Sequence, residues 1–308
     1  MFAVGLAVTG SNLIAVAAVC GLLGAAQAPH TALTDALTLS RLGSARVDEY
    51  GSFRLWQSVG WGVGCIAIGA VLTAAGVDLV PPLYAVAVAI YAVYVARFGR
   101  SRPDARATSG SRLGSVGEAF RSVEHLPMYL FGVLVFATST HAAGDFVPLR
   151  IVSRGGDALL VGIAAGVSAF VEIPFMRSSR SLVDRFGLRG MFTAGAGVYA
   201  AASLAWAAFP DPVAVTAVRI AIGVGFALTY VSMVQMTAHL VPAGLRNTGQ
   251  ALLQICNFGL APMIGGAIGG FVFEHVGPPQ LFLGSAGGIA VGTAMVWMSA
   301  GRRDRAGG

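Results

Sequence analysis

The chain has 308 residues, of which 56% are hydrophobic and 11% are charged, and its net charge is +6. Soluble domains carry about 25% charged residues, so this composition excludes an ordinary water-soluble fold. The 20 basic residues are all arginine and lie mostly in connections between apolar stretches, which favours charged membrane loops over a nucleic-acid-binding surface.

Apolar stretches of about 20 residues predict membrane-spanning helices, because backbone groups in lipid must form hydrogen bonds within their own segment. The apolar residues 1–9 are interpreted as the end of a partial helix that precedes the spans. The sequence therefore predicts an all-α integral membrane protein with nine spanning helices after this partial helix. The predicted spans are 12–38, 52–76, 80–97, 126–148, 158–178, 188–208, 212–238, 247–273 and 279–300.

Arginine is distributed unevenly between the two sides of this predicted bundle. Of the 20 arginines, 17 fall on the side that includes the C-terminus, whereas Arg150 and Arg154 fall on the other side and Arg219 lies within a span. Positively charged loops stay in the cytoplasm during membrane insertion. We therefore expect a multi-pass protein of the cell membrane with a cytoplasmic C-terminus.

The longest polar connection divides the predicted spans into three before it and six after it. Such a division is typical of transporters built from two helical bundles. It predicts an N-terminal bundle at 1–98, a cytoplasmic linker at 99–125, a six-helix bundle at 126–300 and a cytoplasmic tail at 301–308. Nine spans and an internal C-terminus would place Met1 outside without a signal peptide. We therefore expect that two helices and most of a third are missing; a natural nine-helix protein is the alternative.

Five segments resemble those of one transporter group. They are residues 29–37, 50–60, 170–174 (FVEIP), 181–189 and 241–250. The chain resembles the major facilitator superfamily, in the branch of phenylpropionate permease-like and nucleoside–proton symporter-like proteins. This resemblance implies a fold of two helical bundles and secondary transport by alternating access.

The segment 181–189 is similar to the loop motif G-x-x-x-D-R-x-G-x-R of this superfamily. Asp184, Arg185, Gly187 and Arg189 match the motif, while Arg180 replaces its leading glycine. The resemblance implies that Asp184 contacts the start of the helix near residues 50–54 and stabilises one state of the transport cycle.

Three ionisable side chains of the second half are candidates for proton coupling. A charge near the middle of a bilayer costs roughly 2.5–3.5 kcal/mol, so such residues are functional candidates. Glu172 lies deep in the span 158–178, where burial disfavours its charged form. His141 and Asp145 are four residues apart and share one helix face near the outer end of their span. The alternatives are a structural carboxyl at Glu172 and a helix-capping pair at His141 and Asp145.

Polar residues of the first predicted span are candidates for the solute path. Gln27, His30 and Thr31 lie in this span and must face protein or water. Asp35, at its cytoplasmic end, and Arg54, in the next span, could form a gating ion pair. The alternative is that both extend to the lipid headgroups.

The span 247–273 carries a second polar row, formed by Gln250, Gln254 and Asn257 at helical spacing. Amide side chains both donate and accept hydrogen bonds, which suits a hydrated solute path. Hydrogen bonding between helices is an equal alternative. For Arg219 we expect a side chain that extends outward to the membrane surface, with contact to an anionic solute as the alternative.

Together these features predict a proton-coupled transporter of a small organic solute. Phenylpropionate-like acids, nucleosides and sugars all remain possible solutes. The expected partners are the solute, protons and the lipid bilayer, and we expect a monomer without nucleic acid, cofactor or metal. The sequence has no phosphate-binding loop or hydrolase motif, which argues against an ATP-driven pump and against an intramembrane enzyme. A non-transporting remnant or membrane scaffold of the same fold is the second hypothesis.

Overall fold

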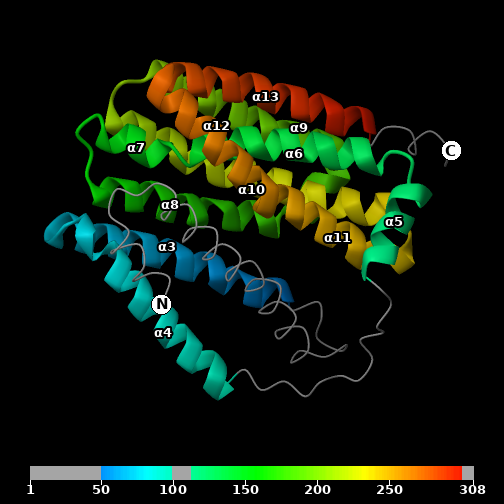
Figure 1. The fold of residues 1–308 in the computed structure, drawn as a ribbon, viewed down its shortest axis with the longest axis horizontal. Coiled ribbons are helices and arrows are strands. Elements are labelled where there is room, and N and C mark those ends of the chain that lie inside the picture. Colours follow the sequence, from blue (N-terminus) through cyan, green and yellow to red (C-terminus); the bar gives the residue numbers. More distant parts are fainter. Residues whose placement is uncertain (1–49, 99–111, 300–308) are drawn as a thin grey trace.

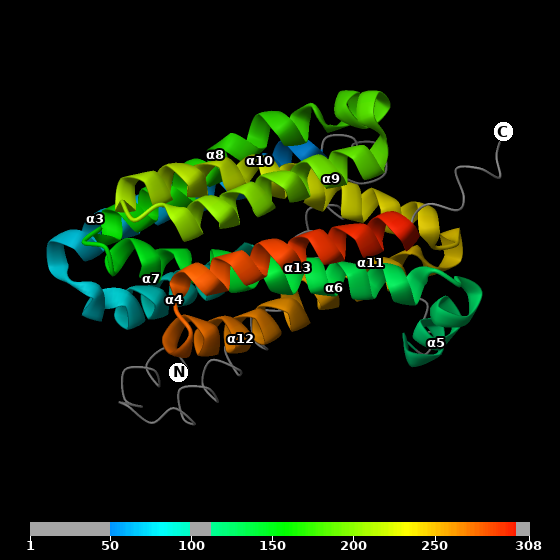
Figure 2. The same ribbon diagram turned by 90° about the horizontal axis from the view of Figure 1, so that it is seen from above.

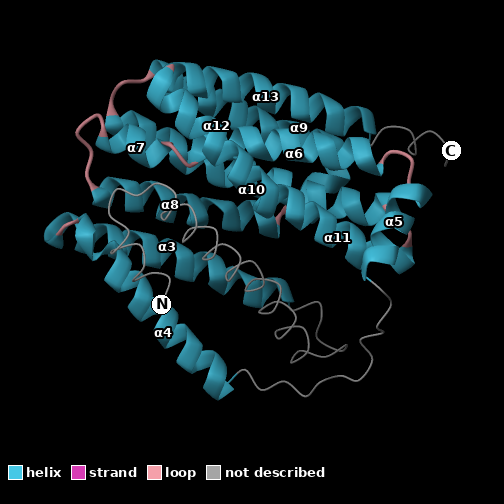
Figure 3. Cartoon of the chain, in the orientation of Figure 1, coloured by secondary structure: helices cyan, strands magenta, loops and turns pink. Residues whose placement is uncertain are grey.

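A computed structural model describes the backbone of residues 50–98 and 112–299 (Figure 1). Within these ranges every regular element is a helix, and none is a strand (Figure 3). Eight of the helical stretches are long and apolar enough to cross a membrane. The prediction of an all-α membrane fold is therefore confirmed. The first predicted span, 12–38, lies outside the described residues.

The long helices reproduce the predicted spans closely. In chain order the helices are α3 (Tyr50–Ala75), α4 (Val80–Phe98), α5 (Arg112–Ser122), α6 (Leu126–Gly144), α7 (Val147–Val152), α8 (Ala158–Arg177), α9 (Ser179–Ala208), α10 (Pro212–Leu240), α11 (Arg246–Gln254), the π-helix η4 (Ile255–Leu260), α12 (Ala261–His275) and α13 (Pro278–Ser299), with single 3-10 turns at Val77–Leu79 and Ala243–Leu245.

Two predicted spans are interrupted at prolines. The span 126–148 divides into α6 and α7, and Pro148 lies in the first turn of α7, where its missing N–H is tolerated. The span 247–273 contains η4, in which the N–H of Ala261 bonds to the carbonyl of Cys256, five residues back. Pro262 follows directly and cannot donate a backbone hydrogen bond. Both interruptions therefore lie where a proline disturbs the helical hydrogen-bond ladder.

The loop motif forms the first turns of α9 rather than a separate connection. Gly187 has φ 67° and ψ 165°, a conformation that is essentially restricted to glycine, and α9 kinks there. The predicted start of this span at residue 188 coincides with the kink. The motif glycine is thus needed for the change in helix direction.

Helices α6 to α13 pack together, with α6 between α12 and α13 (Figure 2). Glycines allow this close approach: a Cβ added to Gly265 would lie 2.6 Å from the carbonyl oxygen of Thr138, and one added to Gly292 would lie 2.5 Å from the backbone nitrogen of Phe136. These glycines therefore let α12 and α13 pack closely against α6. The buried core beside them includes Tyr129 and Phe192.

Helix α3 lies along α8 and joins the first part of the chain to the second (Figure 1). Gly62 and Gly69 of α3 face Gly166 and Gly162 of α8, respectively, so the two backbones approach each other closely at these positions. We call these four glycines the α3–α8 seam. At one end of the seam the backbone N–H of Leu159 donates to Thr73 Oγ1 at 2.8 Å, so α3 caps the first turn of α8.

Candidate functional site

Glu172 lies at the opposite end of the α3–α8 seam from Thr73. Its Oε1 accepts a hydrogen bond of 2.5 Å from Ser58 Oγ on α3. Ser58 is only 5% exposed, and Glu172 is half-buried. Such a short O–H···O distance is typical of a hydroxyl that donates to a charged carboxylate. A titratable carboxyl is therefore held in a polar contact between the two parts of the chain.

The guanidinium of Arg219 lies inside the helix bundle. Its Nη1 is 3.5 Å from Ser168 Oγ, which lies one turn before Glu172 on α8. The expected outward extension of Arg219 is therefore wrong. The side chain crosses from α10 to the middle of α8, because the glycine at position 223 allows these two helices to approach closely.

His141 and Asp145 form the predicted pair at the end of α6. His141 Nδ1 lies 3.2 Å from Asp145 Oδ2, and their side chains are 26% and 51% exposed. Asp145 is also the C-terminal cap residue of α6. The shared helix face is confirmed, and the exposure of both side chains places them near the bundle surface.

The amide row on α11 and η4 faces α10. Gln250 Nε2 donates to the carbonyl of Val234 at 2.8 Å, and Gln254 Nε2 donates to the Tyr230 hydroxyl at 3.1 Å. Asn257 is buried within η4. Two of the three amides thus stabilise helix packing in this structure, which is the alternative that the sequence left open.

The charged loop-motif residues lie at the start of α9. Asp184 is exposed, and the Arg185 guanidinium lies over the ring of Phe186. Arg189 lies over the ring of Trp297, 5.4 Å from its centre, and so links α9 to α13. The side chains of residues 50–55, which Asp184 is expected to contact, are outside the described ones, so that contact remains a prediction.

The predicted solute-path residues Gln27, His30, Thr31 and Asp35 lie outside the described residues. Arg54 belongs to α3, but its side chain is not described. The ion pair between Asp35 and Arg54 therefore remains a prediction. Among the residues that the structure describes, no three His, Cys, Asp or Glu side chains group as a metal site.

Comparison with known proteins decides the family. Ionisable side chains inside a bundle of long apolar helices, such as the carboxyl and the guanidinium found here, are functional candidates in a membrane protein. The sequence profile of the MFS_1 like family matches residues 1–284. The chain belongs to this family. It is therefore a multi-pass membrane protein of the major facilitator type.

Individual relatives agree with membership of the MFS_1 like family. The chain is 26% identical over 292 residues to a maltose permease of Geobacillus stearothermophilus, covering 93% of this chain and 72% of the relative. It is 22% identical over 252 residues to the uncharacterized transporter YwbF of Bacillus subtilis (strain 168), covering 79% and 60%. A crystal structure of a mutant of the nucleoside transporter NupG superposes with a TM-score of 0.65 at 17% identity, covering 78% of this chain and 66% of that one. The NupG likeness supports the fold alone.

Nothing in the sequence of this MFS_1 like chain indicates that Arg150 is buried. Arg150 lies on α7 and is only 4% exposed, whereas its neighbour Arg154 is exposed. Its Nη2 lies 3.5 Å from the carbonyl oxygen of Phe209, the C-terminal cap residue of α9. A cation at a helix C-terminus is favourable, which gives Arg150 a structural role. Sequence alone does not distinguish Arg150 from Arg154, because the burial of Arg150 depends on tertiary packing.

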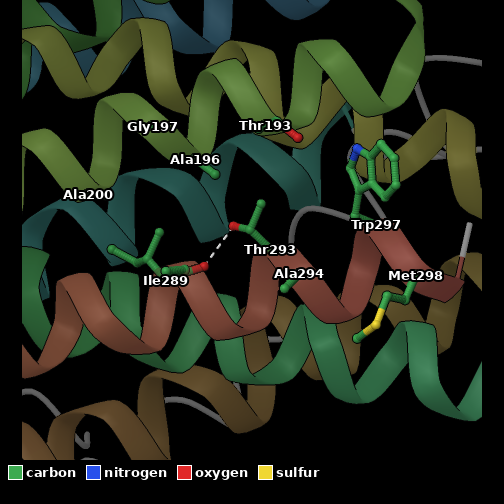
Figure 4. Close-up of a pocket in the computed structure, with 10 residues that line it drawn as sticks. Thr193, Ala196, Gly197, Ala200, Ile289, Thr293, Ala294, Trp297 and Met298 are labelled. Carbon is green, nitrogen blue, oxygen red and sulfur yellow. Dashed lines mark hydrogen bonds between the residues drawn. The ribbon is translucent and has the colours of Figure 1, made fainter.

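A groove of about 490 Å³ lies between α9 and α13 (Figure 4). Ala196 and Ile289 form its buried floor, and Trp297 lies at one end. The hydroxyl of Thr293 bonds to the Ile289 carbonyl of its own helix at 2.6 Å. Among the described residues that were predicted for transport, none lines this groove, so we do not include it in the candidate pathway.

Proposed function

We propose that this chain is a proton-coupled secondary transporter of a small organic solute that works by alternating access. The observation that carries the proposal is the hydrogen bond from Ser58 to Glu172. It places a titratable group at the contact between α3 and α8, which belong to the two predicted bundles. Protonation of this group can therefore act directly on the contact between the bundles.

The coupling follows from the chemistry of the carboxyl group. An ionised Glu172 accepts a strong, charge-assisted hydrogen bond from Ser58, whereas a protonated Glu172 loses its charge and accepts only a weaker one. Binding of a proton thus weakens one end of the α3–α8 seam. We expect this weakening to favour rocking of one bundle against the other about a central site.

The relatives suggest which solutes to test. Their names include a maltose permease and a nucleoside transporter, and the branch resemblance adds phenylpropionate-like acids. We propose that the polar residues Gln27, His30, Thr31 and Asn257 contribute to the path of one of these solutes. His141 and Asp145 would be the outer titratable pair of the same path.

Uptake in proteoliposomes tests the proposal. Radiolabelled maltose, uridine and phenylpropionate are supplied separately, with and without an inwardly directed proton gradient. We expect at least tenfold stimulation of the uptake of one solute by the gradient. Glu172→Gln should remove this stimulation while leaving the amount of inserted protein unchanged, because the amide cannot take up a proton.

Glu274→Gln is the matched control, because Glu274 is an exposed carboxylate at the end of α12. This variant should transport like the wild type. Gradient-driven uptake in Glu172→Gln at the wild-type rate would remove Glu172 from the mechanism. Failure of every solute to cross with the folded wild type would favour the non-transporting scaffold instead.

We also propose that the protein is a monomer of the cell membrane with its C-terminus in the cytoplasm. The uneven distribution of arginine supports this orientation. In this orientation Ser58 and Glu172 lie in the cytoplasmic half of the seam, and the contact of Thr73 with Leu159 lies at its outer end.

A further inference from the structure

The groove between α9 and α13 is a feature that the proposed function does not use. Its volume of about 490 Å³ lies within the range of about 300–1,000 Å³ that is usual for ligand sites. Thr193 and Trp297 lie at one end of the groove, and Ala200 and Ile289 lie at the other (Figure 4). From Ile289 to Trp297 the helix rises about 12 Å, which is close to half of the hydrocarbon core of a bilayer. The groove therefore extends along most of one lipid leaflet.

The groove opens on the outside of the bundle. Gly197, Ala294 and Met298 line it and are exposed, and both helices are membrane spans, so these residues face lipid. Helix α13 lies on the side of the bundle away from α3 and α4, so the groove is remote from the α3–α8 seam (Figure 1). A Cβ added to Gly197 would meet nothing within 4 Å, which shows that this glycine leaves open space.

The wall of the groove suits a hydrocarbon chain. Ala196 and Ile289 form its buried floor, and alanine, glycine and methionine line much of the rest. The hydroxyl of Thr293 donates to the Ile289 carbonyl at 2.6 Å, so its hydrogen is used within α13. The groove thus offers few hydrogen-bonding groups to a polar solute, whereas an acyl chain would gain dispersion contacts along its length.

An arginine lies at the Trp297 end of the groove. The Arg189 guanidinium lies over the ring of Trp297, 5.4 Å from the ring centre. Because α13 ends at Ser299, this end of the groove lies near the membrane surface, where tryptophan is enriched. A guanidinium carries five N–H donors in a fork that matches phosphate, so Arg189 can bind a phosphate in addition to its contacts within the protein. The groove therefore joins an apolar wall in the membrane to a cation at the membrane surface.

We propose that this groove is a binding site for an anionic phospholipid, with one acyl chain between α9 and α13 and the phosphate at Arg189. An anionic lipid is selected because a zwitterionic headgroup carries a cationic group that opposes the attraction to Arg189. The bound lipid connects α9 to α13 on the outside of the bundle. This inference is independent of the solute and of proton coupling, so its test does not require transport.

The test is photocrosslinking of the purified full chain in phosphatidylcholine liposomes. Phosphatidylglycerol and phosphatidylcholine that carry the same diazirine-bearing acyl chain are added separately at low fraction, and labelled residues are identified by mass spectrometry. We expect the phosphatidylglycerol probe to label the groove residues of α9 and α13 about fivefold more than the phosphatidylcholine probe, because one arginine near the membrane surface favours an anionic lipid. Unlabelled phosphatidylglycerol should compete with this labelling, whereas additional phosphatidylcholine should not.

Two pairs of variants separate the apolar wall from the charge. Gly197→Leu fills the groove and should remove most of the labelling by both probes, whereas Gly284→Leu should be labelled like the wild type. Gly284 is the matched control because it is exposed on α13, outside the groove, and its added Cβ also meets nothing within 4 Å. Arg189→Gln should label equally with both probes. Arg121→Gln, which removes an exposed arginine at the end of α5, should keep the preference for phosphatidylglycerol.

Equal labelling of the folded wild type by the two probes would overturn the proposal, because the groove would then hold membrane lipid without selection. Groove residues that neither probe labels would also overturn it, and a particle mass of two chains would then show that a second copy covers the groove. If a variant fails to insert, the competition by unlabelled phosphatidylglycerol on the wild type still decides the case. None of these outcomes changes the proposed transport function, which is measured separately by uptake.

Discussion

At the scale of single residues, a few positions have a backbone conformation or a close neighbour that only one residue type tolerates. Gly187 is the clearest, because its φ of 67° and ψ of 165° would place a Cβ in a forbidden region. It joins Asp184 and Arg185 to Arg189, so its backbone fixes the direction in which the loop-motif charges lie. Gly190, only one turn later, has ordinary helical geometry and space for a methyl group.

This difference predicts opposite effects of two similar substitutions. Gly187→Ala should lower the free energy of unfolding by about 1–3 kcal/mol, because alanine cannot adopt the conformation without strain. Gly190→Ala should leave stability unchanged or raise it by a few tenths up to about 1 kcal/mol, because alanine is favoured over glycine in helices. Unfolding of both variants in mixed micelles would measure the two effects. Equal stability of the two variants would show that the kink at Gly187 is not required.

At the scale of helices, the α3–α8 seam is the feature on which the proposed mechanism depends. Its glycines differ from a glycine of α3 that lies outside the seam: a Cβ at Gly166 of α8 would lie 2.6 Å from the carbonyl oxygen of Gly62, whereas a Cβ at Gly64 of α3 would meet nothing within 4 Å. The seam therefore has a defined face, with hydrogen bonds from Ser58 and Thr73 near its two ends.

Leucine substitutions inside and outside the seam distinguish the loss of the close α3–α8 contact from a general effect of replacing a helical glycine. Gly166→Leu should separate α3 from α8 and lower the melting temperature by several degrees, since overpacking costs about 1–3 kcal/mol. It should also abolish uptake, because Ser58 would no longer reach Glu172. Gly64→Leu should melt and transport like the wild type. Wild-type behaviour of Gly166→Leu would contradict the close approach of the two helices.

Much of this element-level structure follows from sequence, and the exceptions have physical causes. The length of the apolar stretches predicted every described span, because backbone N–H and C=O groups in lipid must form hydrogen bonds within their own helix. The break before α7 and the π-helix η4 could not be placed, since they depend on hydrogen bonds around Pro148 and Pro262. The direction of the Arg219 side chain was predicted wrongly, because the position of a residue in a span does not show how closely the neighbouring helix packs. Here Gly223 of α10 allows α8 to approach, and Arg219 reaches Ser168 on that helix.

At the scale of the whole molecule, the connections alternate between two ends of the bundle. Helices α5 and α7 lie at opposite ends, and α5 follows the arginine-rich segment 99–111 (Figure 1). The positive-inside rule then predicts the orientation of the entire bundle, because one end is rich in arginine and the other carries Arg150 and Arg154. The order in which a solute would meet His141 and Glu172 depends on this orientation.

Cysteine labelling in intact cells tests the orientation. Cys20, Cys65 and Cys256 are first replaced by serine, and single cysteines are then introduced as Ser109→Cys in the predicted linker and Ser153→Cys after α7. A membrane-impermeant maleimide should label Ser153→Cys at once, because that side chain is exposed at the outer end, and should label Ser109→Cys only after the membrane is opened. The reverse pattern would place the α7 end in the cytoplasm, so the His141 and Asp145 pair would be an inner element and a proton entering from outside would reach Glu172 first.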